Sequence, residues 1–88
     1  MLKKTIHNPH TGEILKSEFL DELNMTPNVL ARAINIPTQH IHDIIHGQRS
    51  IAADTDLLLC NFFALSEGYF LRLQKTYDLL DDKRSSNN

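Results

Sequence analysis

The sequence is short of several residue types, and each shortage excludes a class of protein. One cysteine, Cys60, stands among 88 residues, so the chain cannot close an internal disulfide, as is usual in a reducing compartment. No apolar run reaches the roughly 18 residues that a transmembrane helix requires. The lysines at positions 3 and 4 are not followed by the apolar stretch that a secretory signal peptide contains. We therefore expect a cytoplasmic protein without a membrane segment.

The chain also lacks the excess of positive charge that most nucleic-acid-binding proteins carry. Nine Lys and Arg residues stand against eleven Asp and Glu residues, which gives a net charge of −2. Any DNA binding must therefore use a local polar or basic patch with few phosphate contacts, and we expect it to require a dimer. The sequence has neither a glycine-rich phosphate loop nor a nucleophile beside a general base. We therefore expect neither an enzyme nor a cofactor.

The spacing of the apolar residues predicts an all-α chain. Five helices are expected at about residues 12–23, 27–34, 38–46, 53–64 and 67–82, with no strand pattern between them. The helix-start signals are Thr11, Thr26 followed by Pro27, and Thr38, because a hydroxyl accepts from free N–H groups and proline suits the first helical position. We interpret residues 1–9 as a flexible N-terminal arm, 10–82 as one domain and 83–88 as a disordered polar tail.

The segment from Pro27 to His46 has the features of a helix-turn-helix. Ala31 is small enough for two helices to cross closely, and Asn35, four positions later, tolerates the left-handed backbone of a tight turn. Further apolar residues are placed to fix the two helices to each other: Leu30, Ile34, Ile36, Ile41 and Ile44. The alternative is an ordinary helical hairpin that does not contact DNA.

In a helix-turn-helix, the second helix enters the major groove and its N-terminal end contacts the base edges. Gln39 is the strongest candidate, because a glutamine amide can pair with both N6 and N7 of adenine. Asp43 could accept from a cytosine amino group or could simply repel phosphate. The predicted DNA-contacting residues, including those expected at the phosphates, are Thr26, Asn28, Thr38, Gln39, His40, His42, Asp43, Gln48 and Arg49. The alternative for each is a solvated surface residue.

His42 and His46 are spaced like the two histidines of a zinc-protease helix, with Asp43 where that motif has glutamate. The expected helix ends at Gly47, no third ligand is evident, and aspartate is shorter than the glutamate that acts as general base. We therefore expect no metal site. Cys60 lies among leucines and phenylalanines, and we interpret it as a buried apolar residue rather than a reactive thiol.

A set of short segments spread over residues 7–80 carries a family resemblance. They are Gly12–Leu15, Glu18–Leu20, Leu30–Ala33, Ile41–Ile51, Ala53–Thr55, Phe62–Phe63, Leu71–Gln74 and Tyr77–Leu79. In combination they resemble the HigA-type antitoxins, also called virulence-associated protein I, within the Cro/repressor class of helix-turn-helix proteins. The resemblance implies a five-helix, lambda-repressor-like DNA-binding domain.

The resemblance also implies the partners. A homodimer formed through the C-terminal part would bind double-stranded DNA at a palindromic operator, repress its own operon and neutralise a HigB-type toxin that cleaves messenger RNA. The last helix has more apolar surface than one small core needs, so we expect dimer contacts at Tyr69, Leu71, Tyr77, Leu79 and Leu80. The alternative is that all five pack within one subunit.

Two other functions stay open at this point. The chain could be a free-standing transcriptional regulator without a toxin, or a protein-interaction module that does not bind DNA. Binding to an operator would exclude the protein-interaction module. A neighbouring toxin gene would exclude the free-standing regulator.

Overall fold

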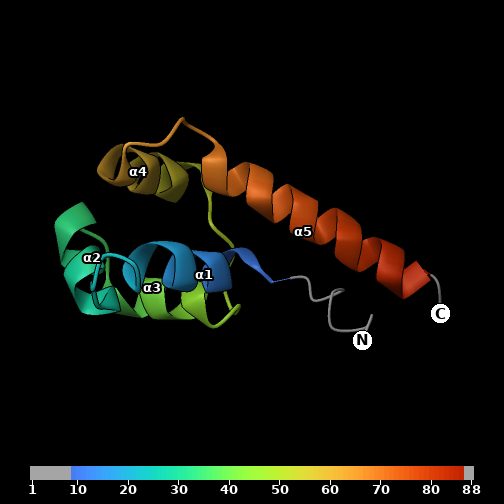
Figure 1. Cartoon of the computed structure of the whole chain (residues 1–88), viewed down its shortest axis with the longest axis horizontal. Helices are drawn as coiled ribbons and strands as arrows, with labels where there is room; N and C mark the ends of the chain where they lie inside the picture. Colours follow the sequence, from blue (N-terminus) through green and yellow to red (C-terminus); the bar gives the residue numbers. More distant parts are fainter. Residues whose placement is uncertain (1–8, 87–88) are drawn as a thin grey trace.

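The computed structural model describes the backbone of residues 9–86 and the side chains of residues 9–81. All regular secondary structure in the described residues is helical, as the sequence predicted. In order they are α1 (Thr11–Ile14), the π-helical η2 (Leu15–Leu20), α2 (Pro27–Ile34), α3 (Thr38–Ile45), α4 (Ala53–Phe63) and α5 (Tyr69–Ser86) (Figure 1). The predicted arm over residues 1–9 lies outside the described residues except for its last position.

The first predicted helix is divided into two segments, α1 and η2. His10, not Thr11, is its N-cap: the Gly12 N–H donates to His10 Nδ1 at 3.1 Å, and the His10 N–H donates to Glu13 Oε1 at 3.0 Å. An imidazole nitrogen thus takes the place of the hydroxyl in a reciprocal capping box. The predicted break at Asn24 is confirmed, because this residue has a left-handed φ of 56°. The regular helix ends earlier than predicted, at Leu20.

The ends of α2 and the first residue of α3 are those predicted, but the N-cap of α3 differs by one residue. Thr26 caps α2, since its Oγ1 accepts from the Val29 N–H at 3.2 Å, and Asn35 ends it at a φ of 58°. The predicted Thr38 cap is wrong. Extended Pro37 occupies the N-cap position, which makes Thr38 the first helical residue.

The start of α5 depends on a buried carboxylate in α4. Asp56 accepts from the backbone N–H groups of Gly68 at 2.7 Å, Phe70 at 3.0 Å and Leu71 at 3.3 Å. These bonds satisfy donors that have no partner within a helix. The predicted start at residue 67 is therefore two residues early, and α5 begins at Tyr69.

The end of α5 also differs from prediction. The helix continues to Ser86, so the tail predicted to be disordered from residue 83 is helical as far as Ser86, and residues 87–88 lie outside the described residues. No glycine or proline interrupts residues 81–86, so no local signal stops the helix there.

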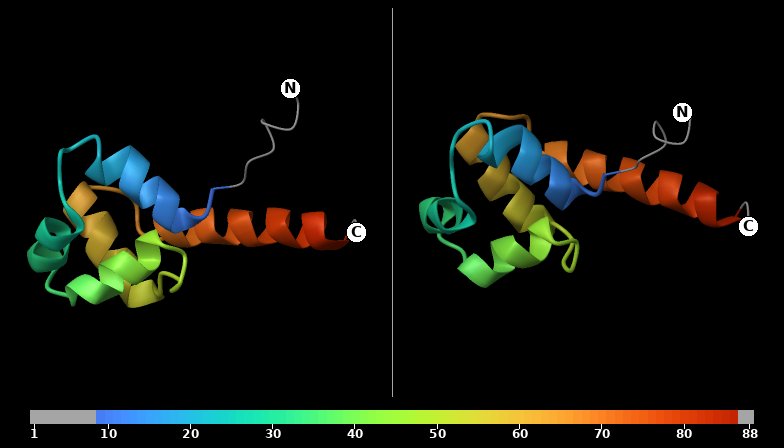
Figure 2. Two further views of the ribbon diagram at one scale, coloured as in Figure 1. Left: turned by 90° about the horizontal axis from the view of Figure 1, so that it is seen from below. Right: turned by 60° about the horizontal axis from the view of Figure 1, so that its bottom comes forward.

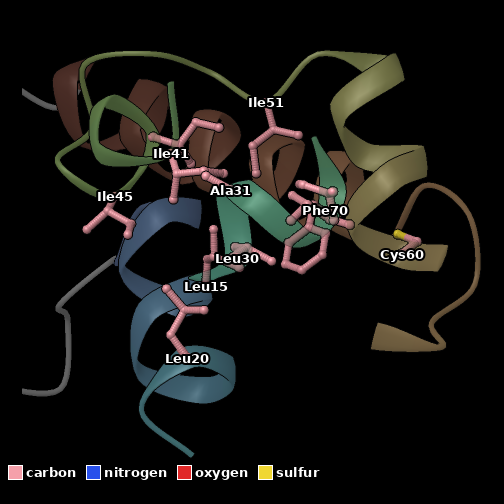
Figure 3. Close-up of a cluster of buried hydrophobic side chains, with 12 residues drawn as sticks. Leu15, Leu20, Leu30, Ala31, Ile41, Ile45, Ile51, Cys60 and Phe70 are labelled. Atoms are coloured by element: carbon pink, nitrogen blue, oxygen red, sulfur yellow. The ribbon is translucent and has the colours of Figure 1, made fainter. Parts of the chain in front are cut away.

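A single apolar core joins the helices, and Figure 3 shows its side chains converging between them. The residues predicted to face inward on the second and third helices are buried, as are Ile51 and Cys60. Among the described side chains, the buried apolar residues of this core are Leu15, Leu20, Leu30, Ala31, Ile34, Ile41, Ile44, Ile45, Ile51, Leu59, Cys60 and Phe70.

The apolar residues of α4 divide between the core and the surface. Leu59 and Cys60 are buried, whereas Leu57, Leu58 and Phe62 are between 40% and 46% exposed. Helix α4 is therefore buried along only part of its apolar surface.

Helix α5 contacts α1 and α4, and its C-terminal part extends away from the other helices (Figure 2). Its last turns therefore project beyond the body of the domain. Among the helices that the structure describes, none combines the length and apolar character needed to cross a membrane.

Candidate nucleic-acid interface

The candidate interface is built on α2 and α3, which pack together through small and branched side chains. Ala31 is 1% exposed at the crossing, and Leu30 and Ile41 are fully buried. The turn between the helices is closed by a hydrogen bond from the Ile36 N–H to the Ala31 carbonyl at 3.0 Å, next to left-handed Asn35. This is the helix-turn-helix that the sequence predicted.

The outer face of α3 carries a connected polar group. Gln39 Nε2 donates to Asp43 Oδ1 at 2.8 Å, and Asp43 Oδ2 lies 3.8 Å from Arg49 Nε. The Gln48 N–H donates to the Asp43 carbonyl at 2.8 Å, which holds the start of the following loop against the helix. The structure therefore brings together four of the nine predicted DNA-contacting residues: Gln39, Asp43, Gln48 and Arg49.

The histidines of α3, and His46 just after it, are half-buried or exposed. The rings of His42 and His46 stack at a centroid distance of 6.2 Å, and His46 Nδ1 lies 2.8 Å from the His42 carbonyl oxygen. His40 is half-buried near the start of the helix, two residues after half-buried Thr38. Within residues 9–81, no group of three or more metal-ligating side chains gathers around this pair.

Thr26 and Asn28 lie apart from the group on α3. Both are exposed at the start of α2, where the first N–H groups of the helix point outward and can bind phosphate oxygens. The Thr26 hydroxyl already accepts from Val29 N–H in its capping bond, but it retains its own hydrogen to donate. These two residues thus offer donors from a different element.

A residue that the sequence analysis missed fixes the loop after α3. Gln74 on α5 bonds both backbone groups of Ile51: the Ile51 N–H donates to Gln74 Oε1 at 2.8 Å, and Gln74 Nε2 donates to the Ile51 carbonyl at 2.9 Å. The partners are 23 residues apart, so no local pattern could have found this pair. In contrast, the four-residue spacing of Gln39 and Asp43 was a visible signal, since such pairs face each other on a helix.

The five predicted dimer residues do not form one surface. Tyr69 packs against Phe19 at a ring-centroid distance of 6.0 Å, and the Tyr77 ring meets the His10 ring edge-on at 6.4 Å. Both tyrosines therefore contact their own subunit. Leu79 is 57% exposed and Leu80 is 44% exposed, and half-buried Leu71 lies two helical turns before Leu79.

Comparison with known proteins identifies relatives over nearly the whole chain. No protein-family model matches it. The chain is 37% identical to virulence-associated protein I of Dichelobacter nodosus over 81 residues, which are 89% of this chain and 75% of the relative.

Two solved structures have the same fold over the same range. The Pseudomonas aeruginosa antitoxin HigA, solved with the higBA promoter, matches with a TM-score of 0.84 and 34% identity over 92% of this chain and 88% of the other. An addiction module antidote protein of the HigA family from Coxiella burnetii matches with a TM-score of 0.83 and 38% identity, with the same coverage of both chains. The chain therefore belongs to the HigA family of helix-turn-helix antitoxins, which includes virulence-associated protein I.

Proposed function

We propose that this chain is the antitoxin of a toxin–antitoxin module, and that it binds a palindromic operator as a dimer and represses its own operon. The observation that carries the proposal is the exposed α3 face, where Gln39 and Arg49 are joined through Asp43. The relative from Pseudomonas aeruginosa was solved with the higBA promoter, which supports operator binding by this chain. We assign the chain no catalytic reaction, and we place its action in the cytoplasm, where the operator is.

We propose that Gln39 reads a base in the major groove, with Thr38, His40 and His42 beside it. Thr26, Asn28, Gln48 and Arg49 then contact the phosphates on either side. The N-terminal part of the second helix of this motif ordinarily meets the base edges, while the flanking segments contact the backbone. The net charge of −2 limits the phosphate contacts of one subunit, so two subunits are needed for useful affinity.

We propose that the dimer forms through the outer side of α5 at Leu71 and Leu79, whereas Leu80, nine residues after Leu71, lies on the opposite side of the helix. Tyr69 and Tyr77 contact their own subunit and would support the helix from the inner side. A two-fold axis would bring the same leucines of both subunits together. It would also set the two α3 helices about 34 Å apart, one turn of DNA.

We propose that the second partner is a HigB-type toxin that cleaves messenger RNA, as family membership implies. The test is to express the neighbouring reading frame in the same cells, alone and together with this chain. The proposal predicts that the neighbour arrests growth alone, that this chain restores growth, and that the two products purify together. If the chain binds its operator but neither rescues growth nor forms a complex, it is a free-standing regulator.

A further inference from the structure

We propose that Asp43 sets the base preference at Gln39, by holding the side-chain amide of Gln39 in a single orientation. The inference rests on the proposed DNA-binding function. The two side chains stand one turn apart on the outer face of α3, and Gln39 Nε2 lies 2.8 Å from Asp43 Oδ1. Asp43 is therefore a positioning residue, and it need not touch a base to act.

The chemistry of the two groups permits only one arrangement of this bond. An ionised carboxylate has acceptors and no donor, whereas an amide has a donating NH₂ end and an accepting oxygen. Only the NH₂ end of Gln39 can therefore bond to Asp43. Turning the amide over would place Oε1 against the carboxylate, two acceptors facing each other. The held amide keeps one N–H and its carbonyl oxygen for the DNA.

A donor beside an acceptor matches adenine and opposes guanine. In the major groove, adenine presents the N7 acceptor and the N6 amino donor, whereas guanine presents two acceptors, N7 and O6. The oriented amide of Gln39 can bond both groups of adenine, but its oxygen would face O6 of guanine. Released from Asp43, the NH₂ end could turn to the DNA and donate both hydrogens to guanine. Loss of the carboxylate should therefore weaken discrimination between the two purines.

Arg49 lies close enough to Asp43 to make its negative charge tolerable on a face that is proposed to approach phosphates. Its Nε lies 3.8 Å from Asp43 Oδ2, the oxygen that Gln39 does not use. The guanidinium offsets part of the carboxylate charge, but Asp43 still lowers attraction to DNA of every sequence. Removing the charge of Asp43 should thus raise the affinity for unrelated DNA. The same change should lower the preference for adenine over guanine. A residue needed only for folding would not produce this combination.

The decisive variant is Asp43→Asn, which keeps the shape and hydrogen bonding of the side chain. An asparagine amide can accept from or donate to Gln39, so it no longer enforces one orientation. Binding is measured by fluorescence anisotropy with the wild-type operator and a set in which each adenine of a half-site is replaced by guanine. We expect the adenine preference at the Gln39-dependent position to fall about tenfold, and affinity for unrelated DNA to rise.

Three further variants complete the design. Asp43→Glu keeps an acceptor-only group and should retain the preference. Glu22→Gln removes one exposed negative charge outside α3 and controls for charge alone, so it should leave the preference unchanged. In a Gln39→Ala background, Asp43→Asn should have no further effect on base discrimination, because the residue through which it acts is gone.

The outcomes separate this inference from the proposed function. If wild type binds its operator and Asp43→Asn keeps the full adenine preference, the positioning role is wrong. It is equally wrong if no operator position depends on Gln39. If the wild-type chain binds no DNA upstream of its gene, the proposed function itself fails, and this inference fails with it. Circular dichroism and thermal melts of each variant exclude unfolding as the cause of a change.

Discussion

Gln74 of α5 bonds both the N–H and the carbonyl of Ile51, and in this way it fastens the loop after α3 to the last helix. Ile51 is 2% exposed, so its backbone groups have little access to water. Gln74 supplies both a donor and an acceptor to the segment that follows Arg49. The position of a predicted phosphate contact thus depends on a side chain far away in sequence.

Replacing Gln74 with alanine should lower stability and DNA binding together. The change removes two hydrogen bonds and leaves the buried N–H and carbonyl of Ile51 without these partners. The free energy of unfolding should fall by about 1–3 kcal/mol. Urea denaturation measures the loss, and operator titration should show weaker binding from the loosened loop. Lys75→Ala, at the next and exposed position on α5, is the control and should change stability little. Equal stability of Gln74→Ala and wild type would contradict the assigned role.

The buried carboxylate of Asp56 should be among the most sensitive positions in the chain. It is 1% exposed and accepts from three backbone N–H groups at the start of α5. Asp56→Ala leaves these donors without a partner, and we expect a loss of about 3 kcal/mol or more in the free energy of unfolding.

Asp56→Asn is a smaller change at the same cap. The asparagine keeps one accepting oxygen, but its NH₂ group would face a backbone N–H donor. We expect a smaller loss, about 1–3 kcal/mol, and faster hydrogen exchange at the Phe70 amide. Asp54→Asn, on the exposed side of the same helix, is the matched control. Unchanged exchange at Phe70 in the Asp56 variants would show that α5 is held by other contacts.

Gly12→Ala should disturb the packing of α1 against α3. A Cβ at Gly12 would overlap the carbonyl group of Ile44 near the end of α3. A backbone group cannot move aside as a flexible side chain can, so we expect a destabilisation of about 3 kcal/mol. Thermal unfolding measures the effect, with exposed Ser17→Ala as a control. A melting temperature like that of wild type would mean that α1 can shift without cost.

The proposed dimer surface predicts different results for two equally exposed leucines. Leu79 is 57% exposed on α5, and Leu23 is 55% exposed in the turn after η2. Leu79→Lys would place like charges at the two-fold contact, so we expect weaker dimerisation in sedimentation and weaker operator binding. Leu23→Lys should leave both unchanged. A Leu79→Lys protein that remains fully dimeric would exclude this surface.

Local signals predicted most of the helix-turn-helix. The cap at Thr26 and the left-handed Asn35 each depend on neighbouring residues, and both were read correctly from the sequence. His10 was missed because an imidazole is an uncommon cap, and Thr38 was misplaced by one residue because Pro37 also suits that boundary. Ala64 ends α4 at a φ of 59° although alanine does not favour this conformation, so nothing in the sequence marked it.

Features that depend on distant contacts could not be predicted from the sequence. Asp56 reads locally as a polar residue on a helix, and only the return of the chain at Gly68 shows that it caps α5. The apolar residues of α5 were correctly assigned to a helix. Their spacing alone did not show which side of α5 packs against the other helices. Tyr69 and Leu71 were therefore grouped together although they lie on different sides of α5.

Whether the α3 face reads an operator can be tested by a footprint on the DNA upstream of the chain's own gene. We predict protection of a two-fold symmetric site at low salt, with half-sites one DNA turn apart. Gln39→Ala should weaken binding to that site by about 1–3 kcal/mol while leaving binding to unrelated DNA unchanged. If the wild-type protein protects no site at low salt, or if Gln39→Ala weakens binding to all DNA equally, the α3 face does not read an operator.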